Sequence, residues 1–103
     1  MNGTQKEKLI DNMTANLPVL RTKADLTQAR LSEMIGISRQ TLVAVENKKR
    51  KMSWNTFLSC CLVFKANPET HKLLDVYNIV TDELENYLSN NQEPNRTKSI
   101  SQG

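Results

Sequence analysis

The chain has 103 residues, 38% of them hydrophobic and 24% charged, with a formal net charge of +3. This length provides for one globular domain. No apolar run approaches the roughly 20 residues that cross a bilayer, and the first residues lack the apolar stretch of a secretory signal. We therefore expect a cytoplasmic protein that does not bind membranes, in which the adjacent cysteines Cys60 and Cys61 are reduced and buried.

Apolar residues recur at helical spacing along the chain, and no segment alternates like a strand, so an all-α fold is predicted. The first helix is expected over residues 5–15. Pro18 fits poorly inside a helix but is welcome in a first turn. A break is therefore expected near Asn16, followed by a short helix over residues 17–24.

Two short helices joined by a tight turn are predicted next. Thr27 is a good N-cap for a helix over residues 28–35, and Gly36 is a suitable residue to end it. Ser38 caps the following helix, over residues 39–46. The apolar residues of these helices that are expected to face inward are Leu31, Met34, Ile35, Leu42 and Val45.

Three further helices complete the prediction. They cover residues 54–64 after the cap Ser53, residues 68–77, and residues 82–88 after the cap Thr81. The apolar stripe predicted for the first of them consists of Trp54, Phe57, Leu58, Cys61 and Leu62, with Cys60 on the more polar side.

The segment 28–47 meets the steric requirements of a helix-turn-helix, in which two short helices cross at a steep angle. Ser32 supplies a small side chain where the helices touch, and Gly36 tolerates the positive φ of the turn. The second helix then keeps one face free for a ligand. Arginine, glutamine and small apolar side chains on such a face suit guanine, adenine and the thymine methyl group. The free face consists of Arg39, Gln40, Val43, Ala44 and Asn47.

Charge is distributed unevenly along the chain. Residues 39–51 contain five basic residues and one acid, Glu46, and four of the cations follow one another at 48–51. Residues 66–93 contain six acids and one fixed cation, Lys72. One end of the molecule is therefore expected to face a polyanion, and the other end water or a partner.

Residues 26–53, LTQARLSEMIGISRQTLVAVENKKRKMS, resemble the Xre/Cro-type helix-turn-helix of lambda-repressor-like regulators. The resemblance covers residues 17–77. It is carried by Leu26, Thr27, Gln28, Leu31, Ile35, Gly36, Ser38, Gln40, Thr41, Leu42, Glu46 and Asn47.

The resemblance implies a lambda-repressor-like bundle of about five core helices, to which this chain adds an N-terminal helix, a short C-terminal helix and a disordered tail. The predicted organisation is an N-terminal helix at residues 1–16, a helix-turn-helix DNA-binding domain at 17–78, a C-terminal helix at 79–89 and a disordered tail at 90–103.

The family also implies a structural ion pair between Arg21 and Glu46. Two positions depart from the family pattern. Lys48 replaces the usual glycine, so that Asn47 or Lys48 itself has to adopt a positive φ, and Ala44 replaces the usual polar residue. The expected base contacts are Arg39, Gln40, Val43 and Ala44. The expected phosphate contacts are Thr27, Gln28, Ser38, Thr41, Asn47, Lys48, Lys49 and Arg50.

The sequence therefore predicts a transcriptional regulator, most simply a repressor, that binds a palindromic operator in double-stranded DNA as a homodimer. An alternative is an antitoxin-like interaction module that binds a protein through its acidic C-terminal third and also binds its own operator. An enzyme is not expected, because no nucleophile with a base and no phosphate-cradling glycine loop is present. His71 has no neighbouring cysteine or aspartate cluster, so no metal or cofactor is expected.

Overall fold

The structure, a computed structural model, describes residues 1–90, and this part of the chain forms six helices and no strand. The all-α prediction is confirmed. The helices are α1 (Gly3–Lys23), α2 (Gln28–Ile35), α3 (Arg39–Glu46), α4 (Trp54–Ala66), α5 (Leu73–Val76) and α6 (Asp82–Leu88).

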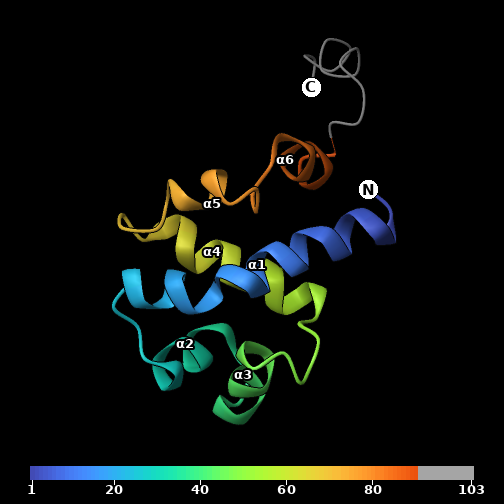
Figure 1. Cartoon of the computed structure of the whole chain (residues 1–103). Helices are drawn as coiled ribbons and strands as arrows, with labels where there is room; N and C mark the ends of the chain where they lie inside the picture. Colours follow the sequence, from blue (N-terminus) through green and yellow to red (C-terminus); the bar gives the residue numbers. More distant parts are fainter. Residues whose placement is uncertain (91–103) are drawn as a thin grey trace.

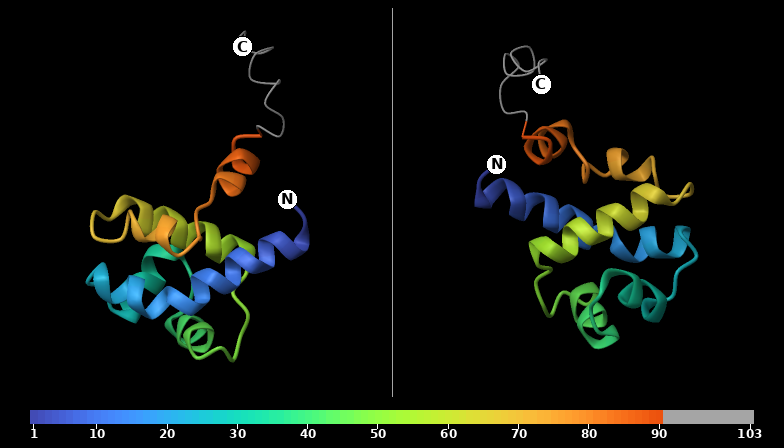
Figure 2. Two further views of the ribbon diagram at one scale, coloured as in Figure 1. Left: turned by 45° about the horizontal axis from the view of Figure 1, so that its top comes forward. Right: turned by 180° about the vertical axis from the view of Figure 1, so that it is seen from behind.

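The two longest helices form the centre of the molecule. Figure 1 shows α1 and α4 crossing in the middle, with α2 and α3 on one side of them and α5 and α6 on the other. The views in Figure 2 show the same order of helices. The core between them contains Met13, Leu17, Leu20, Leu31, Leu42, Phe57 and Phe64, all fully buried. The pair α2–α3 is thus attached to a rigid base through its apolar side.

Helix α1 corrects the prediction of a break near Asn16, because it runs without interruption for 21 residues with Pro18 inside it. A proline inside a helix costs about 3 kcal/mol, since it removes one hydrogen bond and crowds the preceding turn. The apolar face continues in register across the proline, and the Pro18 ring lies on the exposed side. Burial of Leu17 and Leu20 on either side of it offsets that cost.

Two apolar stripes also differ from the prediction. On α4 the buried residues are Phe57, Cys60, Cys61 and Phe64, whereas Leu62 is 73% exposed. The buried stripe is therefore rotated towards Cys60, because α4 packs against both α1 and α2. On α2, Met34 is also exposed, and buried Ser32 takes a place beside Leu31 and Ile35.

The helix predicted over residues 68–77 is reduced to the single turn of α5, Leu73–Val76. The reason is the fully buried Thr70, whose Oγ1 donates to the Phe64 carbonyl at 2.7 Å. This bond satisfies a carbonyl in the last turn of α4 and holds the chain in a turn there. Asn67 accepts from the Glu69 amide through its side chain at 2.8 Å, which also favours a turn.

Helix α6 is held against the first turns of α1. Gln5 donates through Nε2 to Glu83 at 2.8 Å, and the Lys6 ammonium lies 5.1 Å from the Trp54 ring centre and 5.2 Å from that of Tyr87. Leu84 is buried beneath these contacts. The predicted disordered tail, residues 90–103, lies outside the described residues except for its first. Among the residues that the structure describes, no helix is long and apolar enough to cross a membrane.

Candidate nucleic-acid interface

The turn between α2 and α3 is set by Gly36, which has a φ of 76°. Its amide donates to the Glu33 carbonyl at 3.4 Å, and the Ile37 amide donates to the Ser32 carbonyl at 3.1 Å. These two bonds form a Schellman motif, which a glycine at this position favours. Ser32 is buried as expected of a small residue between crossing helices, and its hydroxyl donates to the Ala29 carbonyl at 2.8 Å.

Helix α3 has one anchored face and one free face. Leu42 is fully buried and Val45 is 2% exposed. Arg39 and Gln40 are exposed in the first turn, and neither side chain forms a hydrogen bond or ion pair with another described residue. Val43 and Ala44 are half-buried, so that the most accessible groups lie at the N-terminal end of α3.

The hydroxyl groups near the two helix starts have different donor capacity. Thr27 Oγ1 accepts from the Arg30 amide at 3.0 Å, and Ser38 Oγ accepts from the Thr41 amide at 3.0 Å, so both residues are N-caps. The Ser38 hydroxyl donates to Thr41 Oγ1 at 2.9 Å. Within the described chain, the hydroxyl hydrogens of Thr27 and Thr41 have no acceptor, and these two residues can donate to a phosphate.

A partly buried polar cluster ties the first three helices together. Arg21 donates to Glu46 through Nε at 2.9 Å and Nη2 at 3.2 Å, a bidentate pair, and through Nη1 to the Leu26 carbonyl at 3.1 Å. The Glu46 side chain is only 6% exposed. Gln28 Nε2 also donates to Glu46, at 2.9 Å. Glu46 therefore fixes the end of α3 to both α1 and the start of α2.

The chain leaves α3 through a second Schellman motif. The Lys48 amide donates to the Val45 carbonyl at 3.0 Å, and the Lys49 amide donates to the Ala44 carbonyl at 2.9 Å. Lys48 itself has a φ of 61°, while Asn47 remains at −85°. The positive φ expected at one of these residues therefore falls on Lys48, in the conformation that a glycine would adopt without strain.

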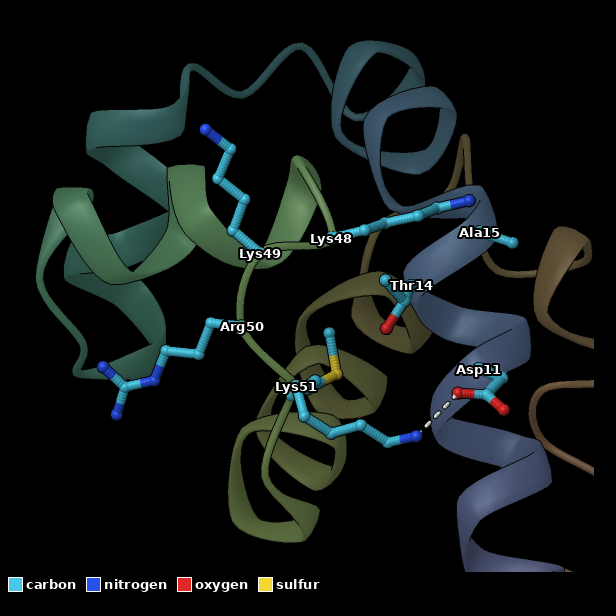
Figure 3. Close-up of a pocket in the computed structure, with 8 residues that line it drawn as sticks. Asp11, Thr14, Ala15, Lys48, Lys49, Arg50 and Lys51 are labelled. Atoms are coloured by element: carbon cyan, nitrogen blue, oxygen red, sulfur yellow. Dashed lines mark hydrogen bonds and ion pairs between the residues drawn. The ribbon is translucent and has the colours of Figure 1, made fainter.

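The cations after α3, which we call the basic loop (residues 48–51), point in different directions (Figure 3). Lys51 lies 3.2 Å from Asp11 and 3.6 Å from Glu7, both on α1. The hydrogen bond to Asp11 is the main cause of a raised Lys51 pKa. Lys48, Lys49 and Arg50 have no ion-pair partner among residues 1–90 and remain available to a polyanion.

The sequence pattern did not reveal the partners of Lys51, because Asp11 and Glu7 lie about 40 residues earlier on a different helix. The one local sign was the helical spacing of Glu7 and Asp11, which places both carboxylates on the same side of α1.

The thiols and the histidine lie away from this surface. Burial raises the pKa of both Cys60 and Cys61 to about 12, and both cysteines are free. His71 Nδ1 lies 2.8 Å from the Lys65 carbonyl. Among the described residues, no group of three or more His, Cys, Asp or Glu side chains is arranged to hold a metal ion.

Comparison with known proteins identifies the segment that contains this surface. Residues 20–58 match the family described as helix-turn-helix, from the last turns of α1 to the first turns of α4. No curated protein and no solved structure matches the chain. Residues 20–58 are therefore similar to the DNA-binding helix-turn-helix domains of Xre/lambda-repressor-like regulators.

Proposed function

We propose that the protein is a sequence-specific transcriptional regulator that reads the major groove of double-stranded DNA with α3. One observation carries this proposal: Arg39 and Gln40 are exposed in the first turn of α3, while Leu42 and Val45 hold its opposite face in the core. Arginine pairs bidentately with guanine and glutamine with adenine in the major groove. Val43 and Ala44 would add apolar contacts to thymine methyl groups through their accessible portions.

Phosphate contacts on both sides of α3 would fix its register on the duplex. We assign them to the free hydroxyls of Thr27 and Thr41 and to the unpaired cations of the basic loop. Gln28 can contribute only its second amide hydrogen, because the first is donated to Glu46. The remaining proposed contacts are Ser38, through its backbone amide at the start of α3, and Asn47, through its side-chain amide, because the Asn47 backbone amide is donated to the Val43 carbonyl.

A homodimer on a palindromic operator is the simplest way for one short helix to reach sufficient specificity, because two-fold symmetry doubles the bases that are read. The proposed dimer interface consists of α5 and α6, which lie on the other side of the α1–α4 pair from α3 (Figure 1). Val76 and Leu88 are 67% and 55% exposed there. We propose a repressor acting in the cytoplasm, since occupying an operator blocks access to it without any further contact.

Selection of bound sequences from a random DNA pool, combined with a mass measurement in solution, tests this proposal. The expected result is a palindrome whose half-sites are about one helical turn apart, bound by two chains. If the selection recovers no preferred sequence at low salt, the proposal of sequence-specific DNA binding is wrong. A single half-site bound by one chain would overturn the dimer.

The acidic end of the molecule supports a second candidate function, an antitoxin-like module that binds a protein partner and also binds its own operator. Asp82, Glu83 and Glu85 are exposed in the first turn of α6, and exposed Leu88 follows them. A basic protein would suit such a surface. Native mass spectrometry of the protein purified from its own cells distinguishes the two functions, because only the second predicts a stoichiometric protein partner.

A further inference from the structure

We infer that residues 93–103, which we call the C-terminal segment, bind within the same chain to a groove between the end of α4, α5 and the start of α6. This inference does not depend on DNA binding and goes beyond the proposed function. The groove lies within the described residues, has a volume of about 460 Å³ and is lined by residues of all three helices. The C-terminal segment lies outside the described residues, so the inference is argued from the groove and from the sequence.

The groove has an apolar wall that is open to solvent. This wall consists of Leu74, Val76 and Val80. Leu74 is only 2% exposed and anchors α5 in the core, whereas the neighbouring Val76 is 67% exposed. An occupant that covers Val76 would remove this apolar surface from water, so the groove favours a ligand with an apolar side chain.

The charges of the groove specify the other groups of the occupant. Lys65 pairs with Glu85 at 3.2 Å, so these two charges offset each other. Lys72, Asp75 and Asp82 also line the groove, and none of them has an ion-pair partner among residues 1–90. Two free carboxylates and one free ammonium group favour an occupant with two cations and one anion.

The C-terminal segment, EPNRTKSISQG, carries this set of charges. It contains one acid, Glu93, and two basic residues, Arg96 and Lys98, and an apolar side chain follows at Ile100. In an extended chain, residues two positions apart lie on the same side. An extended segment would therefore present Arg96, Lys98 and Ile100 together to the carboxylates and the apolar wall of the groove.

The groove is within reach of the point where the described chain ends. Asp82 lies at the start of α6 and Asn90 just after its end, and the eight residues between these positions advance about 12 Å along a helix. Residues 91–95 can span up to about 17 Å when extended, so Arg96 can return along α6 as far as Asp82. Because the segment is tethered, its effective concentration at the groove is about millimolar, and individually weak contacts between exposed groups suffice to fill it.

Binding of the C-terminal segment would also affect the proposed dimer. Val76 belongs to both the groove and the proposed dimer interface, whereas exposed Leu88 is outside the groove lining. The segment would therefore compete with a second chain for Val76, which makes it an internal competitor of dimer formation.

A nitroxide attached to the variant Ser101→Cys of the full chain provides the test, because an unpaired electron broadens the NMR signals of nearby groups. The reagent reacts with the introduced thiol, since Cys60 and Cys61 are buried. The intensities of the Val76 and Val80 methyl signals are compared with the nitroxide oxidised and reduced. We expect both signals to lose most of their intensity in the oxidised sample.

Charge reversal in the labelled chain distinguishes specific binding from random contact of a tethered label. Arg96→Glu/Lys98→Glu should lower the bound fraction about tenfold and restore the methyl signals, because two attractive contacts become repulsive. Its substitutions lie outside residues 1–90, so they leave the described fold in place. Lys8→Glu/Lys23→Glu is the matched control, since it changes the net charge equally at exposed residues outside the groove lining and should leave the broadening unchanged.

Three outcomes would overturn the inference. The first is a wild-type label that does not broaden Val76 and Val80, and the second is equal broadening in the wild type and Arg96→Glu/Lys98→Glu. The third is broadening of isotope-labelled chains without nitroxide when they are mixed with nitroxide-labelled chains, because the groove would then bind the segment of a second copy. None of these outcomes involves DNA, so each would leave the proposed function standing, and absence of DNA binding would leave this inference standing.

Discussion

Replacing Lys48 by glycine is expected to stabilise the fold and weaken DNA binding at the same time. Lys48 has a φ of 61° in the Schellman motif that ends α3. A left-handed conformation costs a residue with a Cβ about 1–2 kcal/mol. Glycine removes this cost but loses about 0.5–1 kcal/mol more backbone entropy on folding. The net gain for Lys48→Gly is therefore about 0.5–1 kcal/mol.

A gain of this size raises the melting temperature by roughly 2–8 °C for a domain of this length. Thermal melts followed by circular dichroism at 222 nm, together with urea titrations, measure it. Lys48→Ala is the matched control, because it removes the same charge but keeps the Cβ. Lys49→Gly is a second control, since Lys49 does not have a positive φ, and this variant should be less stable than the wild type.

The affinity for DNA should fall, whereas the stability of Lys48→Gly rises. Both Lys48→Gly and Lys48→Ala remove a cation with no ion-pair partner among the described residues, so each should reduce the salt dependence of log Kd by about 0.9. If Lys48→Gly is no more stable than Lys48→Ala, the backbone at residue 48 is not strained. If both variants keep the wild-type salt dependence, the Lys48 ammonium does not contact a phosphate.

Three further predictions follow from the same structure. Arg39→Ala should leave the melting temperature unchanged, because Arg39 is exposed. In a selection experiment the same variant should relax the base preference at one position per half-site by about 1–3 kcal/mol. An unchanged base preference would show that another surface contacts the bases. Glu46→Gln should cost about 3–5 kcal/mol in urea unfolding by leaving the half-buried Arg21 cation without a counter-charge, with an Arg21→Met/Glu46→Leu double variant recovering most of it; a loss under 1 kcal/mol would show that the pair is well solvated. The thiols of Cys60 and Cys61 have a pKa of about 12 in the folded protein and near 9.0 when unfolded, so they favour the folded state below pH 9 and this contribution is lost as the pH rises to 12. The free energy of unfolding should therefore fall between pH 9 and pH 12, and the Cys60→Ala/Cys61→Ala double variant should show a flatter pH profile. Rapid reaction of the native thiols with a disulfide reagent at pH 8 would contradict their burial.

The helix-turn-helix was predictable from sequence because short-range rules determine most of it. The caps Thr27 and Ser38 and the terminator Gly36 act within a few residues, and the structure places α2 and α3 at the residues that these signals indicate. The inward positions of Leu42 and Val45 also follow from helical spacing alone. Each of these features depends on backbone geometry close by, so distant parts of the chain had little influence on them.

Features that depend on distant packing were predicted less well. The proline rule is also local, and at Pro18 it gave the wrong result because the core contacts of Leu17 and Leu20 outweigh it. Leu17 and Leu20 continue the helical spacing of the earlier apolar residues of α1, and this regular spacing in the sequence favours one continuous helix. On α4, by contrast, two alternative apolar stripes exist, and only contact with α1 and α2 decides that Cys60 is inside.

Gln28 shows how tertiary structure changes the chemistry of a residue whose position was correctly predicted. It begins α2, where a phosphate contact is expected, yet its Nε2 donates to Glu46 at the end of α3. This bond forms because the turn at Gly36 brings the start of α2 beside the end of α3, and local spacing does not show that Gln28 will take Glu46, 18 residues away, as its partner. Any phosphate held by the second amide hydrogen of Gln28 is then linked through Glu46 to Arg21, so contact with the DNA backbone and the rigidity of α3 depend on the same hydrogen-bond chain.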